Sequence, residues 1–274
     1  MMSWKKIQVG APSYLGARPL LYGMTRCPVK HVDLVYDEPA TLADKLEQGQ
    51  LDAALIPSIE YLRGVGAYFL MGPALLTRPG AGGLLLVSRV PLDRINRIAV
   101  NEFCRTPIAA LRIVLDSLHH LLPDICVVKN AELEWQDHYD AVLMSGDRAL
   151  HYLSQNHNGT EKMFDIGRMW YRLTSTPLVH SVWAYNDISL VGLLEKVLHS
   201  SRNLGISSLS VLANGLATTT PYDPEFLLDY FNDRWDYQLG TAELESLRQL
   251  EEYARRYQLT RQRRLESTVL VPEA

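Results

Sequence analysis

Short apolar runs alternate with amphipathic segments over the first quarter of the chain. The apolar runs have the length of strands, and one of them alternates apolar and polar positions as a half-buried strand does. The segment 39–50 carries helix signals, with Pro39 at its start and Gly49 at its end. The pattern predicts strands at 7–9, 31–37 and 51–57 and helices at 18–24, 39–50 and 58–66. Such alternation is typical of a parallel sheet with helices on its faces.

The same alternation returns between residues 91 and 153. Strand-like runs end near residues 101, 130 and 146, and the helical segment that begins at Thr106 has a capping residue followed by Pro107. The last part of the chain is mostly helical, with apolar residues three and four positions apart. We therefore expect an α/β protein of two lobes, each a mainly parallel sheet flanked by helices: lobe I at 1–90 plus 186–274, and lobe II at 91–185.

Four strand-to-helix junctions carry small or hydroxyl residues directly after an apolar strand. Open parallel sheets bind ligands outside the carboxyl ends of their strands, where helix N-termini offer unpaired amides to an anion. Arg18 and Arg105 add positive charge at two junctions, although each arginine could equally pair with an internal carboxylate. We expect a cleft between the lobes that holds a small anion. The junctions are residues 9–19, 54–62, 99–111 and 142–150.

Composition narrows the class of partner. The chain has 274 residues, a net charge of −4 and 47% hydrophobic residues. It lacks the basic surplus of nucleic-acid-binding proteins and any apolar stretch long enough for a membrane helix. Cys27, Cys104 and Cys126 do not have metal-ligand spacing, so we expect no metal and a reducing compartment. Because the first residues do not resemble a secretory signal, we expect a cytoplasmic protein.

Common catalytic motifs are missing from the sequence. It contains no GxSxG, no GxxxxGK[ST] and no HExxH pattern. His180 draws attention because it lies near a segment expected to cross between the lobes, but a core histidine would explain it as well. Asp147 follows Gly146 at a helix start, where helix capping is the simpler role. The residue patterns alone do not identify a general base.

Read together, the junctions resemble the chorismate dehydratases of the futalosine route to menaquinone, which have the two-lobed fold of type II periplasmic binding proteins. The resemblance implies a carbon–oxygen lyase that converts chorismate to 3-[(1-carboxyvinyl)oxy]benzoate without a cofactor. It extends over nearly the whole chain. The matching segments are Ser13–Leu20, Leu42–Leu62, Val87–Ile95, Cys104–Arg112, Ala141–Leu150, Asp165–Ala184 and Tyr230–Leu250.

The resemblance also implies a set of substrate-binding residues. In the family an asparagine usually stands at the position of Gly16 and a serine at that of Gly83. Two hydroxyl residues usually stand at the positions of Phe103 and Cys104. These departures favour an alternative, a paralogue that binds another aromatic acid without dehydrating it. The sister enzyme that makes dihydroxynaphthoate fits less well, because its opening motif differs. The implied residues are Ser13, Tyr14, Gly16, Arg18, Ser58, Gly83, Cys104, Arg105, Thr106, Gly146 and Asp147, with Asp147 and Glu60 the nearest candidates for a base.

Overall fold

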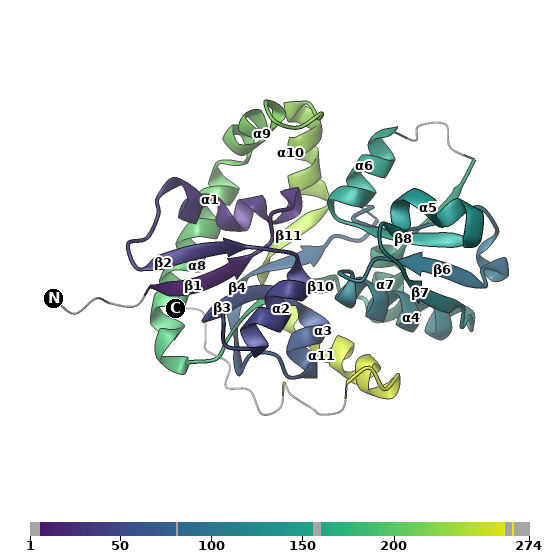
Figure 1. The fold of residues 1–274 in the computed structure, drawn as a ribbon, viewed down its shortest axis with the longest axis horizontal. Helices are drawn as coiled ribbons and strands as arrows, with labels where there is room; N and C mark the ends of the chain where they lie inside the picture. Colours follow the sequence, from purple (N-terminus) through teal and green to yellow (C-terminus); the bar gives the residue numbers. More distant parts are fainter. Residues whose placement is uncertain (1–5, 81, 156–159, 261–264, 266–274) are drawn as a thin grey trace.

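The computed structural model of the chain describes residues 6–80, 82–155, 160–260 and 265. Its strands form two sheets that lie side by side, each with helices packed on it (Figure 1). The α/β fold class with two sheets is confirmed. Both sheets are mixed and not mainly parallel as expected, because strands such as β10 and β5 run antiparallel to their neighbours.

The first sheet has the strand order β11-β4-β10-β3-β1-β2. Three strands run parallel, and β10 and β4 extend the sheet in antiparallel fashion, with β11 antiparallel to β4. The helices of this lobe include α1, α2, α3, α8, α9 and α10. The strands are β1 (Ile7–Ala11), β2 (Val32–Tyr36), β3 (Ala53–Pro57), β4 (Tyr68–Thr77), β10 (Leu178–Tyr185) and β11 (Trp235–Leu239). The helices are α1 (Arg18–Arg26), α2 (Pro39–Glu47), α3 (Ser58–Arg63), α8 (Val191–Ser207), α9 (Leu209–Ala217) and α10 (Pro224–Asp233).

The second sheet has the order β7-β6-β8-β5-β9. Strand β6 is parallel to its neighbours β7 and β8, and strand β5 is antiparallel to its neighbours β8 and β9. The strands are β5 (Leu84–Ser88), β6 (Arg97–Val100), β7 (Asp124–Val127), β8 (Ala141–Ser145) and β9 (Lys162–Asp165). The helices are α4 (Arg105–His119), α5 (Ala131–His138), α6 (Asp147–Gln155) and α7 (Ile166–Thr174).

Strand pairing bears on where the lobes divide. The sequence-based boundaries assign β5 to lobe I and β10 to lobe II, whereas β5 pairs with β8 and β9 and β10 pairs with β3 and β4. The chain leaves the first sheet at Thr77 and returns to it at Leu178, and these two residues are paired neighbours. We propose a division of the lobes at these two positions.

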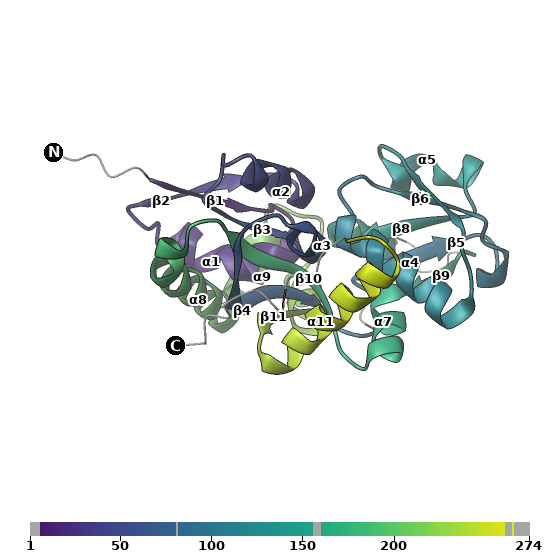
Figure 2. The ribbon, with the colours of Figure 1, turned by 90° about the horizontal axis from the view of Figure 1, so that it is seen from below.

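One apolar core runs through both lobes. A single cluster of buried side chains contains Ala54 and Leu62 from the first lobe together with Ile98 and Val114 from the second. Helix α11 (Thr241–Arg256) extends this core, because it packs on β10 and α3 and also contacts α4 (Figure 2). The two lobes are therefore held by shared packing as well as by the chain.

Candidate functional site

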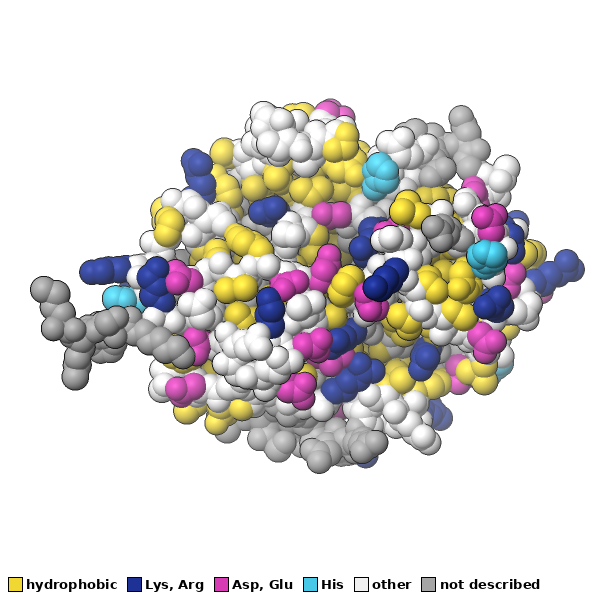
Figure 3. Space-filling model, viewed as in Figure 1, with side chains coloured by type: hydrophobic (Ala, Val, Ile, Leu, Met, Phe, Trp, Pro, Cys, Tyr) yellow, Lys and Arg dark blue, Asp and Glu magenta, His cyan; other side chains and the backbone are white. Residues whose placement is uncertain are grey.

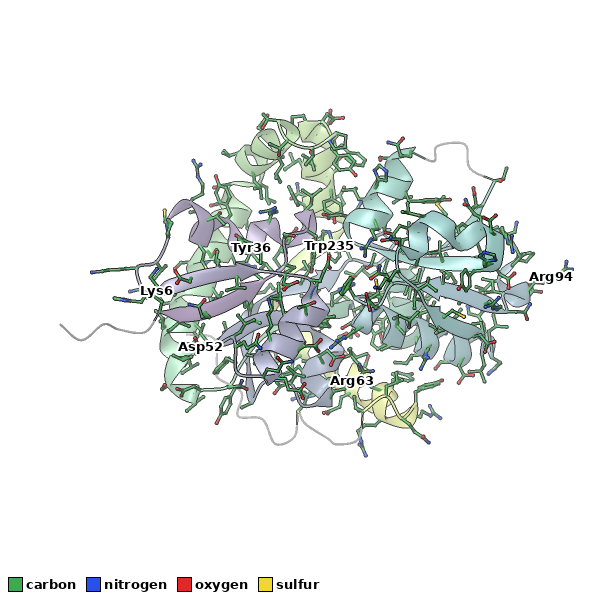
Figure 4. The ribbon with its side chains drawn as sticks, viewed as in Figure 1. Lys6, Tyr36, Asp52, Arg63, Arg94 and Trp235 are labelled. Carbon is green, nitrogen blue, oxygen red and sulfur yellow. The ribbon has the colours of Figure 1, made fainter. Side chains whose placement is uncertain are left out.

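A cavity of about 280 Å³ lies between the lobes, close to the lower end of the 300–1,000 Å³ typical of small-molecule sites. Residues from all four predicted junctions line it, and Trp235 lies where the two lobes meet (Figure 4). The junctions of β1, β3, β6 and β8 contribute Ser13, Tyr14, Pro57, Phe103, Cys104, Arg105, Pro107, Ser145, Gly146, Asp147 and Arg148. Other elements contribute Glu38, Pro39, His180, Ser181 and Trp235.

The structure separates the predicted site residues into two groups. The residues that line the cavity are Ser13, Tyr14, Cys104, Arg105, Gly146 and Asp147. Gly16, Arg18, Ser58, Gly83 and Thr106 are described but are not among the residues that line it.

Asp147 is the first residue of α6, and its carboxylate reaches the opposite lobe. The backbone N–H of Leu15 donates to both of its oxygens, at 2.8 and 3.0 Å, and the hydroxyl of Tyr230 donates at 3.3 Å. Burial raises the pKa of this carboxyl, while these donors, the amide of Gly16 and the charge of Arg18 act in the opposite direction. The amides of the first junction therefore hold a carboxylate that belongs to the protein.

Arg105 makes internal ion pairs, which is the alternative that the sequence left open. Its guanidinium binds both carboxylate oxygens of Asp44, at 2.9 and 3.0 Å, and lies 3.4 Å from a carboxylate oxygen of Glu60. Glu60 is buried and also pairs with Arg63. Arg148 is likewise paired, with Glu132 at 2.9 Å. The positive charges of the cavity wall are thus balanced by carboxylates of the chain.

Charges of both signs are interspersed over the face of the molecule drawn in Figure 3, including the region where the lobes meet. Such a surface produces no strong field of one sign.

Thr106 and Ser58 lie behind the cavity wall, where α3 and α4 pack together. Thr106 lies inside α4 and does not cap it, because Cys104 is the N-cap residue; its hydroxyl accepts the N–H of Ile59 at 3.3 Å. The Ser58 hydroxyl is fully buried and has no hydrogen-bond partner among the described residues. The Thr106 hydroxyl therefore joins the two helices.

The two unusual glycines both face the indole of Trp235. A Cβ at Gly16 would lie 2.9 Å from the indole ring, closer than packed atoms allow, and a Cβ at Gly83 would lie 3.8 Å from it. The indole therefore lies beside both positions at which the resemblance implies polar side chains. Trp235 is not among the ligand contacts predicted from the sequence, since nothing in its local pattern links it to the junctions.

His180 and Ser181 are further cavity residues, both on β10. Burial lowers the pKa of His180 to about 4, so its imidazole is neutral near pH 7. Its ring meets that of Trp235 edge to face, with centroids 5.6 Å apart. The Ser181 hydroxyl hydrogen-bonds Tyr14, whose pKa is raised by burial.

Cys104 lies in the cavity wall as a buried thiol. Its sulfur is 3.4 Å from the hydroxyl oxygen of Ser145, and burial raises its pKa. A raised pKa keeps the thiol protonated, so Cys104 is a weak nucleophile despite its place at a helix start.

The described residues contain no group of three or more His, Cys, Asp or Glu side chains arranged to hold a metal ion. No helix within them is long and apolar enough to cross a membrane.

Comparisons with known proteins agree with this architecture. Residues 7–256 match the sequence model of a family described as menaquinone biosynthesis. A chorismate dehydratase of Thermus thermophilus is 24% identical over 257 residues, which cover 87% of this chain and 91% of that protein. A solved structure from Archaeoglobus fulgidus is similar with a TM-score of 0.74 at 17% identity, covering 94% of this chain and all of that one.

Periplasmic binding proteins share the fold as well. The alkanesulfonate-binding protein of Xanthomonas axonopodis, solved with MOPS bound, superposes with a TM-score of 0.69 at 13% identity. The match covers 97% of this chain and 98% of that one. The aliphatic sulphonate-binding protein of Escherichia coli gives a TM-score of 0.67 at 13% identity, over 98% and 92% of the two chains. These likenesses show a periplasmic-binding-protein-like fold.

Proposed function

This chain belongs to the menaquinone-biosynthesis family, and on that premise we propose that it is a lyase that removes water from chorismate. The product would be 3-[(1-carboxyvinyl)oxy]benzoate, formed on the futalosine route in the cytoplasm without a cofactor. The observation that carries the proposal is the convergence of all four strand-to-helix junctions on one interlobe cavity, in a chain related to a chorismate dehydratase.

The reaction requires positioning of the substrate and two proton movements, in which a base takes the ring proton and an acid, which can be the same group once protonated, gives a proton to the leaving hydroxyl. A ring carbon loses its proton, the electron pair of that C–H bond becomes the new ring double bond, and the hydroxyl leaves with a proton as water. Aromatisation of the ring makes the step downhill, and no electron acceptor is required. A cavity that orients the ring and excludes water supplies the main physical requirements.

Of the two carboxylates considered as bases, Asp147 is the better placed. It lines the cavity, and burial raises its pKa toward the range useful for proton transfer. Glu60 is not among the lining residues, and it is held by Arg63 and Arg105. We therefore assign the proton-transfer role to Asp147 and keep the other lining residues of the predicted set as substrate contacts. They are Ser13, Tyr14, Cys104, Arg105 and Gly146.

A second candidate is a paralogue that binds a small aromatic carboxylate without converting it. Two observations favour it. The indole of Trp235 lies against Gly16 and Gly83, and the Asp147 carboxylate occupies the amide of Leu15. An added ligand carboxylate would have to compete with that internal one.

The deciding experiment is incubation of the purified protein with chorismate, followed by chromatography with mass detection of the benzoate product. Our proposal expects turnover above the rate in buffer, and a loss of about 10²–10⁴-fold in Asp147→Asn. Glu60→Gln is the matched carboxylate control and should lose less. Binding of chorismate or of benzoate by calorimetry with no product from chorismate would support the binding protein. Absence of product together with no binding of either acid would reject both candidates.

A further inference from the structure

Strand β10 contains a bulge at His180. Val179 pairs with Leu76 of β4 and Ser181 pairs with Leu75, so β10 advances two residues where β4 advances one. In a regular strand neighbouring side chains point to opposite faces, and a bulge redirects them. The consequence here is that both His180 and Ser181 line the interlobe cavity.

The imidazole of His180 has unused hydrogen-bonding capacity at this place. The residue is 9% exposed, and its Nε2 atom has no hydrogen-bond partner among the described residues. Its neighbour Ser181 is by contrast engaged with Tyr14. A buried polar atom without a partner is costly, and native structures keep few of them. Ten other buried side-chain atoms of the described residues also lack a partner, but among all eleven only the nitrogens of His180 and Trp235 belong to residues that line the cavity. Their place in the cavity wall points to a partner that arrives with the ligand.

The chemistry of the ring restricts that partner. A neutral imidazole has one nitrogen that donates and one that accepts, and the low pKa of His180 keeps it neutral near pH 7. A hydroxyl group can satisfy either nitrogen, because it both donates and accepts. A carboxylate would instead favour the charged imidazolium, which burial disfavours here. Trp235, edge to face with His180, offers an apolar surface for a ring that bears the hydroxyl.

We propose that His180 is a specificity-determining residue that hydrogen-bonds a hydroxyl group on a ring seated against Trp235. The inference rests on the proposed function, because it takes the interlobe cavity to be the ligand site. It adds the residue that contacts the ring hydroxyl. In chorismate the ring hydroxyl is the group that leaves, so this contact would select molecules that carry the reacting group.

The test compares binding of benzoate and 3-hydroxybenzoate, measured by calorimetry or by quenching of tryptophan fluorescence. We expect the wild-type protein to bind the hydroxylated acid about 3- to 10-fold more tightly, the value of one neutral hydrogen bond. His180→Phe keeps an aromatic ring without nitrogens and should remove the preference, so that the ratio of the two affinities falls to about 1. His180→Gln should restore part of the preference.

Exposed His151 supplies the matched control, since His151→Phe should change neither affinity. Should the substituted proteins fail to fold, the wild-type protein still decides, because at saturation 3-hydroxybenzoate should shift the ring-nitrogen NMR resonances of His180 further than benzoate does. Equal binding of the two acids, no binding of either, or an unchanged preference in His180→Phe would overturn the inference. Chorismate turnover tests the proposed function separately, so each idea can fail without the other.

Discussion

The carboxylate of Asp147 accepts hydrogen bonds from the backbone N–H of Leu15 in the opposite lobe, with N–O distances of 2.8 and 3.0 Å. The two residues are 132 positions apart in the chain and belong to different lobes. Leu15 opens the turn before α1, where the sequence analysis expected an external anion. In this structure the chain supplies that anion itself, and it also ties the lobes together on the cavity side.

Replacing Asp147 by alanine should destabilise the protein by about 1–3 kcal/mol, because the Leu15 amide and the Tyr230 hydroxyl lose their acceptor. Asp147→Asn keeps one oxygen acceptor and should cost less. The free energy of unfolding in urea measures both effects. Asp93→Ala removes an exposed carboxylate as a control and should change little. Equal urea midpoints for Asp147→Ala and Asp93→Ala would contradict the role of this contact.

A side chain introduced at position 16 should displace the indole of Trp235 even in the ligand-free protein. In Gly16→Ala the new Cβ would lie 2.9 Å from that ring, so we expect a loss of about 1–3 kcal/mol of stability. The emission spectrum of the protein should change as well, since Trp235 has to move. Gly215→Ala is the control, because a Cβ there meets open space within α9. An unchanged melting temperature and emission in Gly16→Ala would show that the site has more room than described.

The neutral state of His180 predicts an acid-sensitive component of stability. Its folded pKa of about 4 lies below the ordinary 6.5, so the unfolded chain binds the proton more readily. The contribution of neutral His180 to the free energy of unfolding is complete above pH 6.5 and is lost as the pH falls toward 4. It amounts to about 3 kcal/mol. As the pH falls over that range, we expect the free energy of unfolding of the wild type to decrease by about 3 kcal/mol relative to that of His180→Phe. A parallel pH dependence of the two proteins would show that His180 is not buried in neutral form.

The thiols should differ strongly in reactivity. Cys27 is exposed, whereas Cys104 is buried with a raised pKa. Iodoacetamide at pH 8 should modify Cys27 at least about 10-fold faster than Cys104, because only the thiolate reacts. Peptide mapping by mass spectrometry gives both rates in one experiment. Unfolding in guanidinium should make the rates similar, and fast modification of native Cys104 would indicate an activated thiol in the cavity.

The sequence was informative where local signals determine structure. Strand-to-helix junctions have composition cues such as the Thr106–Pro107 pair, and parallel sheets bring such junctions to one edge. For this reason the convergence of the four junctions could be anticipated. Strand β4 is not among the predicted strands, because Gly72 and Pro73 interrupt its apolar run and usually argue against a strand interior.

The choice of partners could not be predicted, because it depends on tertiary distances. Arg105 pairs with Asp44, which is 61 positions away in the chain. No local sequence pattern distinguishes an arginine in such an ion pair from an arginine that binds a ligand. The bulge that turns His180 toward the cavity depends in the same way on how β10 pairs with β4. Trp235 reaches the site only because β11 lies at the end of the first sheet.

The position of β10 between β3 and β4 has a consequence for how the protein is made. The strands of the second sheet lie in one continuous stretch, residues 84–165, so a ribosome releases all of them before β10 emerges. The first sheet cannot form completely until β10, which ends at residue 185, has been synthesised. Strand β11 and helix α11 are synthesised after it. During synthesis the second lobe can fold while the first lobe still has unpaired strand edges. We therefore expect the nascent chain to be most prone to aggregation before β10 has been made.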